Sequence, residues 1–390
     1  MIMTVYLDHA ATTPIRPEAL AAYTEALAVG GNPSSIHQAG QRARMLLEDG
    51  RARVATSLGV DPVEVVFTSG GTESINLAIK GLFWARQRDR PRPRVVVPAG
   101  EHHATIDAIE WLRTHEGAVI DEIPIDGTGR IDRSALAARL ADSADVALVT
   151  LLYANNEVGT LQPVAEVVAA AHARGVPVHC DAVAAYGQVP IDVAALDLDA
   201  VSVSAHKAGG PVGIGALVLR RSTVVEPLIH GGGQERQVRS GTQDAAAAAA
   251  FGAAASLGAH DVSGLRDRLI AGVLERVPSA VLRGHPTERL PGNAHFTVAN
   301  CEGDSLLFLL DSVGVAVSTG SACQAGVPEA SHVLLAMGLP YAEARGALRV
   351  TLGWSTTEAD VDAFLAALPD AVARASAAGM ASREPSIGAR

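Results

Sequence analysis

The chain lacks several features that would place it in a special class of protein. Of its 390 residues only 19% are charged and 48% are hydrophobic, which argues against a disordered or fibrous chain. It has no run of about 18 apolar residues, and its start lacks a charged segment followed by a long apolar one. We find no internal repeat. These absences predict a globular, cytoplasmic protein with a large core and no membrane contact.

Cysteine is scarce, and negative charge exceeds positive charge. Cys180, Cys301 and Cys323 make an odd number without paired spacing, which argues against a disulfide framework or a zinc site and fits a reducing compartment. No metal is expected. The formal net charge of −11 argues against direct nucleic-acid binding. We interpret the one basic cluster, at residues 86–94, as a solvated turn.

Short apolar runs alternate with longer segments of helical period. EVVFTSG precedes GTESINLAIKGLFWARQ, RVVVP precedes IDAIEWLRTH, and VALVTLLYA precedes PVAEVVAAAHARG, followed by VPVHCDA and AVSVSAHK. This rhythm predicts an α/β sheet with helices on both faces. In such folds the site lies at the carboxyl ends of the strands. The polar residues placed there are Thr72, His102, Asn156, Asp181, His206 and Lys207.

The pattern changes near residue 258, after the alanine-rich segment AAAAAAFGAAASLGA, to a second α/β arrangement. We predict a large ligand-binding domain at residues 15–257 and a small domain made of residues 1–14 and 258–376. Residues 377–390 have no apolar periodicity and are predicted to form a flexible tail.

Three features together indicate a cofactor. FTSGGTES places Gly70, Gly71 and Thr72 between a strand and a helix, where they could cradle a phosphate or form only a turn. Asp181 ends an apolar strand, where a carboxylate is costly to bury unless it faces a cation such as a pyridinium nitrogen. Lys207 lies among small residues in SAHKAGG. A phosphate site, a strand-end carboxylate and a secluded lysine are what a protein requires to bind pyridoxal 5'-phosphate. The alternative is a buried ion pair between Lys207 and Asp181.

A series of motifs then matches a known family in order and approximate spacing. They are YLDHAATTP, GNPSS, FTSGGTES, EHHA, ANNEVGT, CDA, SAHK, HGGGQERQVRSGT, STGSAC and LRVTLG. From Tyr6 to about Leu368 the chain resembles the cysteine desulfurases of the NifS/IscS type, in the class V aminotransferase family. The resemblance implies a fold type I pyridoxal phosphate enzyme, with a mostly parallel seven-stranded sheet sandwiched by helices and a smaller α/β C-terminal domain. It also implies a homodimer.

The resemblance assigns the cofactor contacts residue by residue. Lys207 resembles the lysine that holds the cofactor as a Schiff base, and Asp181 resembles the partner of the ring nitrogen. His102 resembles the histidine that stacks on the ring, although a plain reading makes it a helix-start residue, as we expect His103 to be. The residues that resemble phosphate ligands are Gly71, Thr72, Ser204, His206 and, across the dimer interface, Thr242.

Other residues resemble the family's substrate contacts. Asn156 is similar to the asparagine beside the cofactor's phenolic oxygen and the substrate carboxylate. Arg349 resembles the arginine that clamps that carboxylate, a task suited to its planar fork, and Asn32 is expected to help. Cys323, between small residues in STGSACQAG, resembles the mobile catalytic thiol of the long-loop branch. We expect Cys180 and Cys301 to be structural.

The implied reaction converts L-cysteine to L-alanine. Lys207 moves the Cα proton, and the Cys323 thiolate takes the sulfur as a persulfide. The sulfur then passes to an acceptor protein for iron–sulfur cluster assembly or tRNA thiolation.

One departure from the family stands inside the cofactor motif. Family members usually read Asp-Ala-Thr-Gln, whereas this chain reads DAVAA and has Ala184 in place of the glutamine. We expect a water or another side chain, such as Tyr186, to replace the lost hydrogen-bond donor, and the pocket to be larger. This keeps open a selenocysteine lyase, or another C–S lyase or aminotransferase of the same fold. A third possibility, from a different class, is a catalytically idle homologue that binds a partner.

Overall fold

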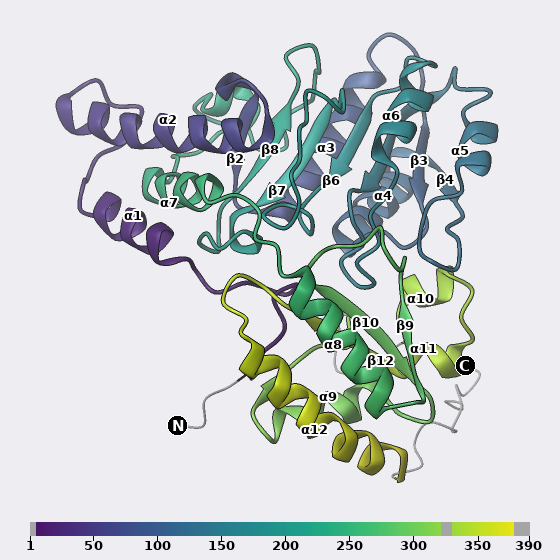
Figure 1. The fold of residues 1–390 in the computed structure, drawn as a ribbon. Helices are drawn as coiled ribbons and strands as arrows, with labels where there is room; N and C mark the ends of the chain where they lie inside the picture. The colour runs from purple at the N-terminus through teal and green to yellow at the C-terminus, as the bar shows by residue number, and fades with distance from the viewer. Residues whose placement is uncertain (1–4, 321–329, 378–390) are drawn as a thin grey trace, which may run out of the picture.

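A seven-stranded sheet forms the centre of the larger lobe in the computed structural model, which describes residues 5–320 and 330–377 (Figure 1). Its strands are β2 (Val65–Thr68), β3 (Arg94–Pro98), β4 (Val119–Ile123), β5 (Val146–Leu152), β6 (Val178–Asp181), β7 (Ala200–Ser204) and β8 (Gly215–Leu219). The order is β2-β8-β7-β6-β5-β3-β4. β8 is antiparallel to both neighbours, and the other pairs are parallel. The predicted mostly parallel sheet is confirmed.

Helices cover both faces of this sheet, and each face has its own hydrophobic core. The helices of the lobe are α1 (Pro17–Leu27), α2 (Gln38–Leu58), α3 (Gly71–Arg86), α4 (His103–Glu116), α5 (Arg133–Arg139), α6 (Val164–His172) and α7 (Ala245–Ser256). One core packs α3 and α4 against the sheet, and the other packs α2, α5, α6 and α7. Neighbouring strand residues such as Leu148 and Val149 face opposite cores, as the pleat requires. Short 3₁₀ helices span Pro62–Glu64, Ala205–Lys207 and Glu235–Gln237.

Small residues let α2 and α7 pack backbone to backbone. A Cβ on Gly50 would lie 2.3 Å from the carbonyl oxygen of Ala248, and one on Gly252 would lie 2.7 Å from the Cα of Gly50. The alanine-rich sequence of α7 therefore serves close helix packing. In Figure 1, α1 and α2 extend sideways from the sheet beside α7.

The smaller lobe is built on the antiparallel sheet β12-β10-β9. Its strands and helices are α8 (Ser263–Arg276), β9 (Ala280–Arg283), β10 (Asn293–Val298), α9 (Gly303–Asp311), β11 (Val315–Ala316), α10 (His332–Ala336), α11 (Tyr341–Ala344), β12 (Ala347–Thr351) and α12 (Glu358–Ala377). The chain's first strand, β1 (Val5–Tyr6), pairs with β11 in parallel. Leu7 lies in the same core as α8, α9 and α12.

The start of the chain is thus packed against its last third. The predicted domain bounds, 15–257 for one domain and 1–14 with 258–376 for the other, stay a prediction. α12 runs to Ala377, so the first residue of the predicted tail is helical, and residues 378–390 lie outside the described part. Within the described residues, no helix is long and apolar enough to cross a bilayer, and no cluster of His, Cys, Asp or Glu is arranged to hold a metal ion.

Candidate active site

The carboxyl ends of β5, β6 and β7 open into a cavity of about 390 Å³. Its walls come from the large lobe, the N-terminal segment and the small lobe. The lining residues are Ala10, Ala11, Gly71, Thr72, Ile75, His102, Leu152, Asn156, Asp181, Val183, Ala184, Ser204, His206, Lys207, Ser318, Gly320 and Arg349. The cavity thus brings together all six polar residues that the sequence placed at strand ends.

Asp181 is the last residue of β6, and its carboxylate is buried in the cavity wall. Its Oδ1 accepts a hydrogen bond of 2.9 Å from the backbone N–H of Val183. Burial raises the pKa of this carboxyl to about 6, although the Val183 N–H and the Lys207 charge lower it. An ionised carboxylate in such a place favours a cationic ligand atom opposite it.

Lys207 follows β7 in the short 3₁₀ helix and points across the cavity to the N-terminal segment. Its Nζ donates hydrogen bonds to the carbonyl oxygens of Ala10 and, at 3.0 Å, of Ala11. Burial and the Arg349 charge lower the pKa of the amine to about 8, whereas Asp8 and Asp181 raise it. A substantial neutral fraction near pH 8 makes Lys207 able to act as a nucleophile or a base.

His102 has two tasks at the edge of the cavity. It is the N-cap of α4, where its Nδ1 accepts a hydrogen bond of 3.0 Å from the N–H of Ala104. Burial and the Lys207 charge lower the pKa of the ring to about 4, so it is neutral near pH 7. The ring also lines the cavity, and His103 begins the helix, as expected.

An anion cradle faces the same space. Gly71 and Thr72 form the N-terminus of α3, where backbone N–H groups are left for a ligand. A Cβ on Gly71 would lie 2.7 Å from Val183 Cγ2, so the close approach needs glycine. Ser204 Oγ is buried and has no hydrogen-bond partner within the described residues. His206 completes the group, with its Nδ1 3.1 Å from Thr12 Oγ1.

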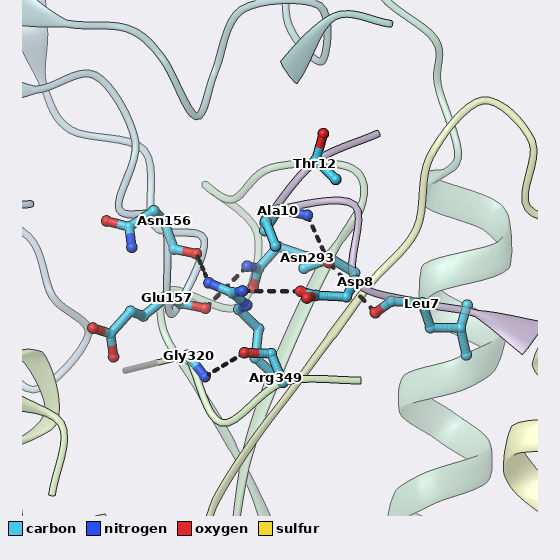
Figure 2. Close-up of polar contacts among 12 residues, drawn as sticks. Leu7, Asp8, Ala10, Thr12, Asn156, Glu157, Asn293, Gly320 and Arg349 are labelled. Atoms are coloured by element: carbon cyan, nitrogen blue, oxygen red, sulfur yellow. Dashed lines mark hydrogen bonds and ion pairs between the residues drawn. The ribbon is translucent and has the colours of Figure 1, made fainter. Parts of the chain in front are cut away.

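Arg349 brings a buried cation from β12 (Figure 2). Its Nη1 donates to the backbone oxygen of Asn156 at 3.1 Å, and its Nη2 pairs with Asp8 Oδ1 at 3.0 Å. Both Arg349 and Asn156 line the cavity. A planar fork of this kind suits a ligand carboxylate.

Comparison with known proteins decides the family. A model of the class-V aminotransferase family matches residues 5–364. An IscS-like cysteine desulfurase of Mycobacterium tuberculosis (strain ATCC 25618 / H37Rv) is 51% identical over 385 residues, which is 96% of this chain and 98% of the relative. The chain belongs to the cysteine desulfurases of the class-V aminotransferase family.

Solved structures agree with this assignment. A NifS-like protein superposes with a TM-score of 0.88 at 33% identity, covering 95% of this chain and all of its own. SspA, solved in complex with cysteine, superposes with a TM-score of 0.80 at 30% identity, covering 89% of this chain and 98% of its own. The desulfurase fold type expected from the sequence is therefore confirmed.

Two described residues of the predicted desulfurase site do not line the cavity of this chain. Asn32 binds locally, accepting a hydrogen bond of 2.9 Å from the N–H of Ser34, and Thr242 is exposed; neither lines the cavity. Their roles stay predictions, and for Thr242 the predicted role lies across a dimer interface. Cys323 lies outside the described residues. Cys180 and Cys301 are buried, Cys180 within β6.

The desulfurase chain's departure at residue 184 has a structural consequence. Ala184 lines the cavity. The expectation that Tyr186 supplies the missing donor there is wrong, because its hydroxyl lies 2.7 Å from Ser57 Oγ and the tyrosine lines a different cavity. A water or another side chain remains the predicted replacement for that donor.

Sequence reasoning missed the part that the N-terminal segment plays. Asp8, Ala10 and Ala11 contact Lys207 or Arg349, yet the motif YLDHAATTP served only to support the family resemblance. The signal was present as an acidic residue followed by small ones in a segment with no helical or strand period. This local pattern does not show which residues the segment contacts, because Lys207 and Arg349 lie far along the chain.

Proposed function

We propose that the chain is a pyridoxal phosphate-dependent cysteine desulfurase. It would convert L-cysteine to L-alanine and hold the sulfur as a persulfide on Cys323. The observation that carries the proposal is one cavity lined by a buried strand-end carboxylate, a lysine of lowered pKa and a buried arginine fork. Together with the cofactor, these groups can bind an amino acid and move its Cα proton.

The cavity residues fit pyridoxal phosphate. Asp181 offers a buried carboxylate to the protonated ring nitrogen. Ser204 Oγ, buried without a partner in the described part of the chain, and the N-terminus of α3 at Gly71 and Thr72 would hold the phosphate. His102 would lie against the ring, and Lys207 Nζ would meet the aldehyde.

The bound cofactor would supply an electron sink for the negative charge that develops at the substrate Cα. Lys207 would take the Cα proton on its neutral amine and return a proton later. Asp181 would keep the ring nitrogen protonated. Arg349 would bind the substrate carboxylate with the N–H groups that Asp8 and Asn156 leave free.

Sulfur transfer would fall to Cys323. Its thiolate would attack the substrate sulfur, forming the S–S bond as the C–S bond breaks. The electron pair of the C–S bond would stay with the carbon, which takes a proton and becomes the methyl group of L-alanine. The persulfide would then pass to an acceptor-protein thiol, in iron–sulfur cluster assembly or tRNA thiolation. We propose that the enzyme works as a cytoplasmic homodimer.

A second candidate function follows from Ala184. The small side chain widens the cavity wall where a glutamine would stand, which favours a selenocysteine lyase or another C–S lyase of this fold. Relative turnover of L-cysteine and L-selenocysteine separates the two candidates.

The decisive experiment measures alanine and sulfide from L-cysteine with excess dithiothreitol. We expect equal amounts of both products from the unchanged protein and neither from Lys207→Ala or Cys323→Ala. Cys301→Ala is the matched control, because this thiol is buried in the small lobe against Ser376, and it should keep activity. A protein that binds cofactor but releases no alanine would refute the desulfurase, and failure to bind cofactor would favour the idle homologue.

A further inference from the structure

Two cationic side chains share the cavity, and their charges must be balanced. Arg349 is buried, with only 6% of its side chain exposed, and its charge lowers the pKa of Lys207. His102 and His206 supply no negative charge, and burial and Lys207 lower the pKa of each ring to about 4, so both are neutral near pH 7. Like charges in a poorly hydrated site repel strongly, so an anion is needed beside them.

The N-terminal segment supplies partners to both cations. Asp8 Oδ1 pairs with Arg349 Nη2 at 3.0 Å, and the carbonyl oxygens of Ala10 and Ala11 accept hydrogen bonds from Lys207 Nζ. Figure 2 shows Asp8 and Ala10 on the same bend beside Arg349. One stretch of four residues therefore contacts the two groups that would bind and activate the substrate.

The bend is held firmly to both lobes. Ala10 N–H donates to Thr351 Oγ1 at 2.9 Å, and Thr13 N–H donates to the backbone oxygen of His206 at 3.1 Å. The Tyr6 hydroxyl lies 3.1 Å from the carbonyl oxygen of Asp8 and 2.8 Å from that of Thr12. The segment can therefore fix positions across the cavity.

Asp8 acts from outside the space that the substrate would fill. It does not line the cavity, whereas Ala10, Ala11 and Arg349 do. Among the described residues, the Asn156 carbonyl engages one N–H of Nη1 and Asp8 engages one N–H of Nη2, so each of these nitrogens keeps a second N–H for a ligand carboxylate. The ion pair thus orients the fork without blocking it.

We propose that Asp8 is a positioning residue, which aims the Arg349 fork into the cavity and offsets its charge at the Lys207 amine. The catalytic importance of this role of Asp8 rests on the proposed function. The charged and titratable groups facing Lys207 are Arg349 from β12, Asp8 from the N-terminal segment, Asp181 from β6, His102 at the start of α4 and His206. Removing the Asp8 charge leaves Arg349 unbalanced, which disfavours the protonated form of Lys207.

The chain has only two lysines, Lys80 and Lys207, so the test can be direct. Protein labelled with ¹³C at the lysine ε carbon gives two side-chain signals, which we would titrate with cofactor bound and after its removal. In Asp8→Asn we expect the Lys207 midpoint to move to lower pH by about one unit. The acid limb of the alanine-forming rate should move in the same direction. Lys80, whose Nζ lies 4.5 Å from the Trp111 ring centre on the outside of the sheet, is the internal control and should not move.

Matched variants separate charge from folding. Asp8→Glu keeps the negative charge, so its Lys207 midpoint should lie near that of the unchanged protein. Asp362→Asn removes an exposed carboxylate that pairs with a different arginine, Arg268, at 2.6 Å. This variant should leave the Lys207 midpoint unchanged. If Asp8→Asn does not fold, Arg349→Met is measured instead, and the Lys207 midpoint should rise. An unmoved Lys207 midpoint in folded Asp8→Asn, or in Arg349→Met, overturns the inference. Absence of alanine from the unchanged protein would count against the proposed function alone.

Discussion

At the scale of single residues, Asp181 carries a charge that destabilises the fold unless a cation faces it. Burial raises its pKa from 3.8 to about 6, so the folded state holds a proton more tightly than the unfolded state. The stabilisation from this group is fully present below about pH 4 and is lost as the pH rises through 6. Near pH 7 the ionised carboxylate therefore costs stability in the absence of a cationic partner.

We expect Asp181→Asn to raise the stability of the cofactor-free protein at pH 7 by about 2 to 3 kcal/mol, and to weaken retention of pyridoxal phosphate. The gain should shrink as the pH falls toward 4. Thermal unfolding across this pH range, with and without cofactor, is the measurement. Asp121→Asn is the control, because that buried carboxylate pairs with Arg94 at 2.7 Å and its loss should destabilise. A lower stability for Asp181→Asn at pH 7 would contradict the argument.

A second residue-scale prediction concerns Ala184, which lines the cavity where the family usually has glutamine. In Ala184→Gln the new amide can donate a hydrogen bond to the cofactor's phenolic oxygen. This hydrogen bond competes with the one that the same oxygen accepts from a neighbouring protonated group. We expect the midpoint of the pH titration of the bound cofactor's visible absorbance to move to lower pH. Ala182→Ser, at the buried neighbour of Asp181, should leave that midpoint in place. An unchanged curve for Ala184→Gln would rule the idea out.

At the scale of secondary structure, His102 combines a helix cap with a wall of the cavity. Asparagine can cap a helix as the histidine does, whereas alanine cannot. We expect His102→Ala to lose about 1 kcal/mol of stability, and His102→Asn to keep it. Both variants should bind pyridoxal phosphate less tightly, because both lack the ring. Thermal unfolding and cofactor affinity are the measurements, and tight cofactor binding by His102→Asn would show that the ring is dispensable.

Much of this arrangement could be predicted from the sequence. β6 and β7 are short apolar runs that end in polar residues, so Asp181 and Lys207 could be placed at one edge of the sheet. The pairing of Asp8 with Arg349 could not be predicted, because 341 residues separate them and no local period records such a contact. Asn32 and Thr242 stand in recognisable motifs, yet neither lines the cavity of this chain, because a motif does not record where its residues lie in space.

At the scale of the whole molecule, the exposed Thr242 leads to a prediction about assembly. If Thr242 completes the cavity of a partner subunit, Thr242→Ala and Lys207→Ala should each be inactive or strongly impaired. Mixed dimers of the two variants would contain one cavity with both residues intact. We expect activity to return when the variants are unfolded and refolded together, measured as alanine formation. Two Lys207→Ala preparations mixed in the same way are the control, and a lack of recovery in mixed dimers would place Thr242 elsewhere.

The pairing of the two ends of the chain also bears on how the protein is made. β1 needs β11, Leu7 accepts a hydrogen bond from Thr351, and Asp8 meets Arg349. A nascent chain leaving the ribosome must therefore keep its first strand unpaired until almost all of it has been translated. Contacts so distant in sequence form slowly, and exposed strand edges invite aggregation meanwhile. The paired arrangement of Asp8 and Arg349 can thus be completed only at the end of synthesis, and a prematurely terminated chain would lack it.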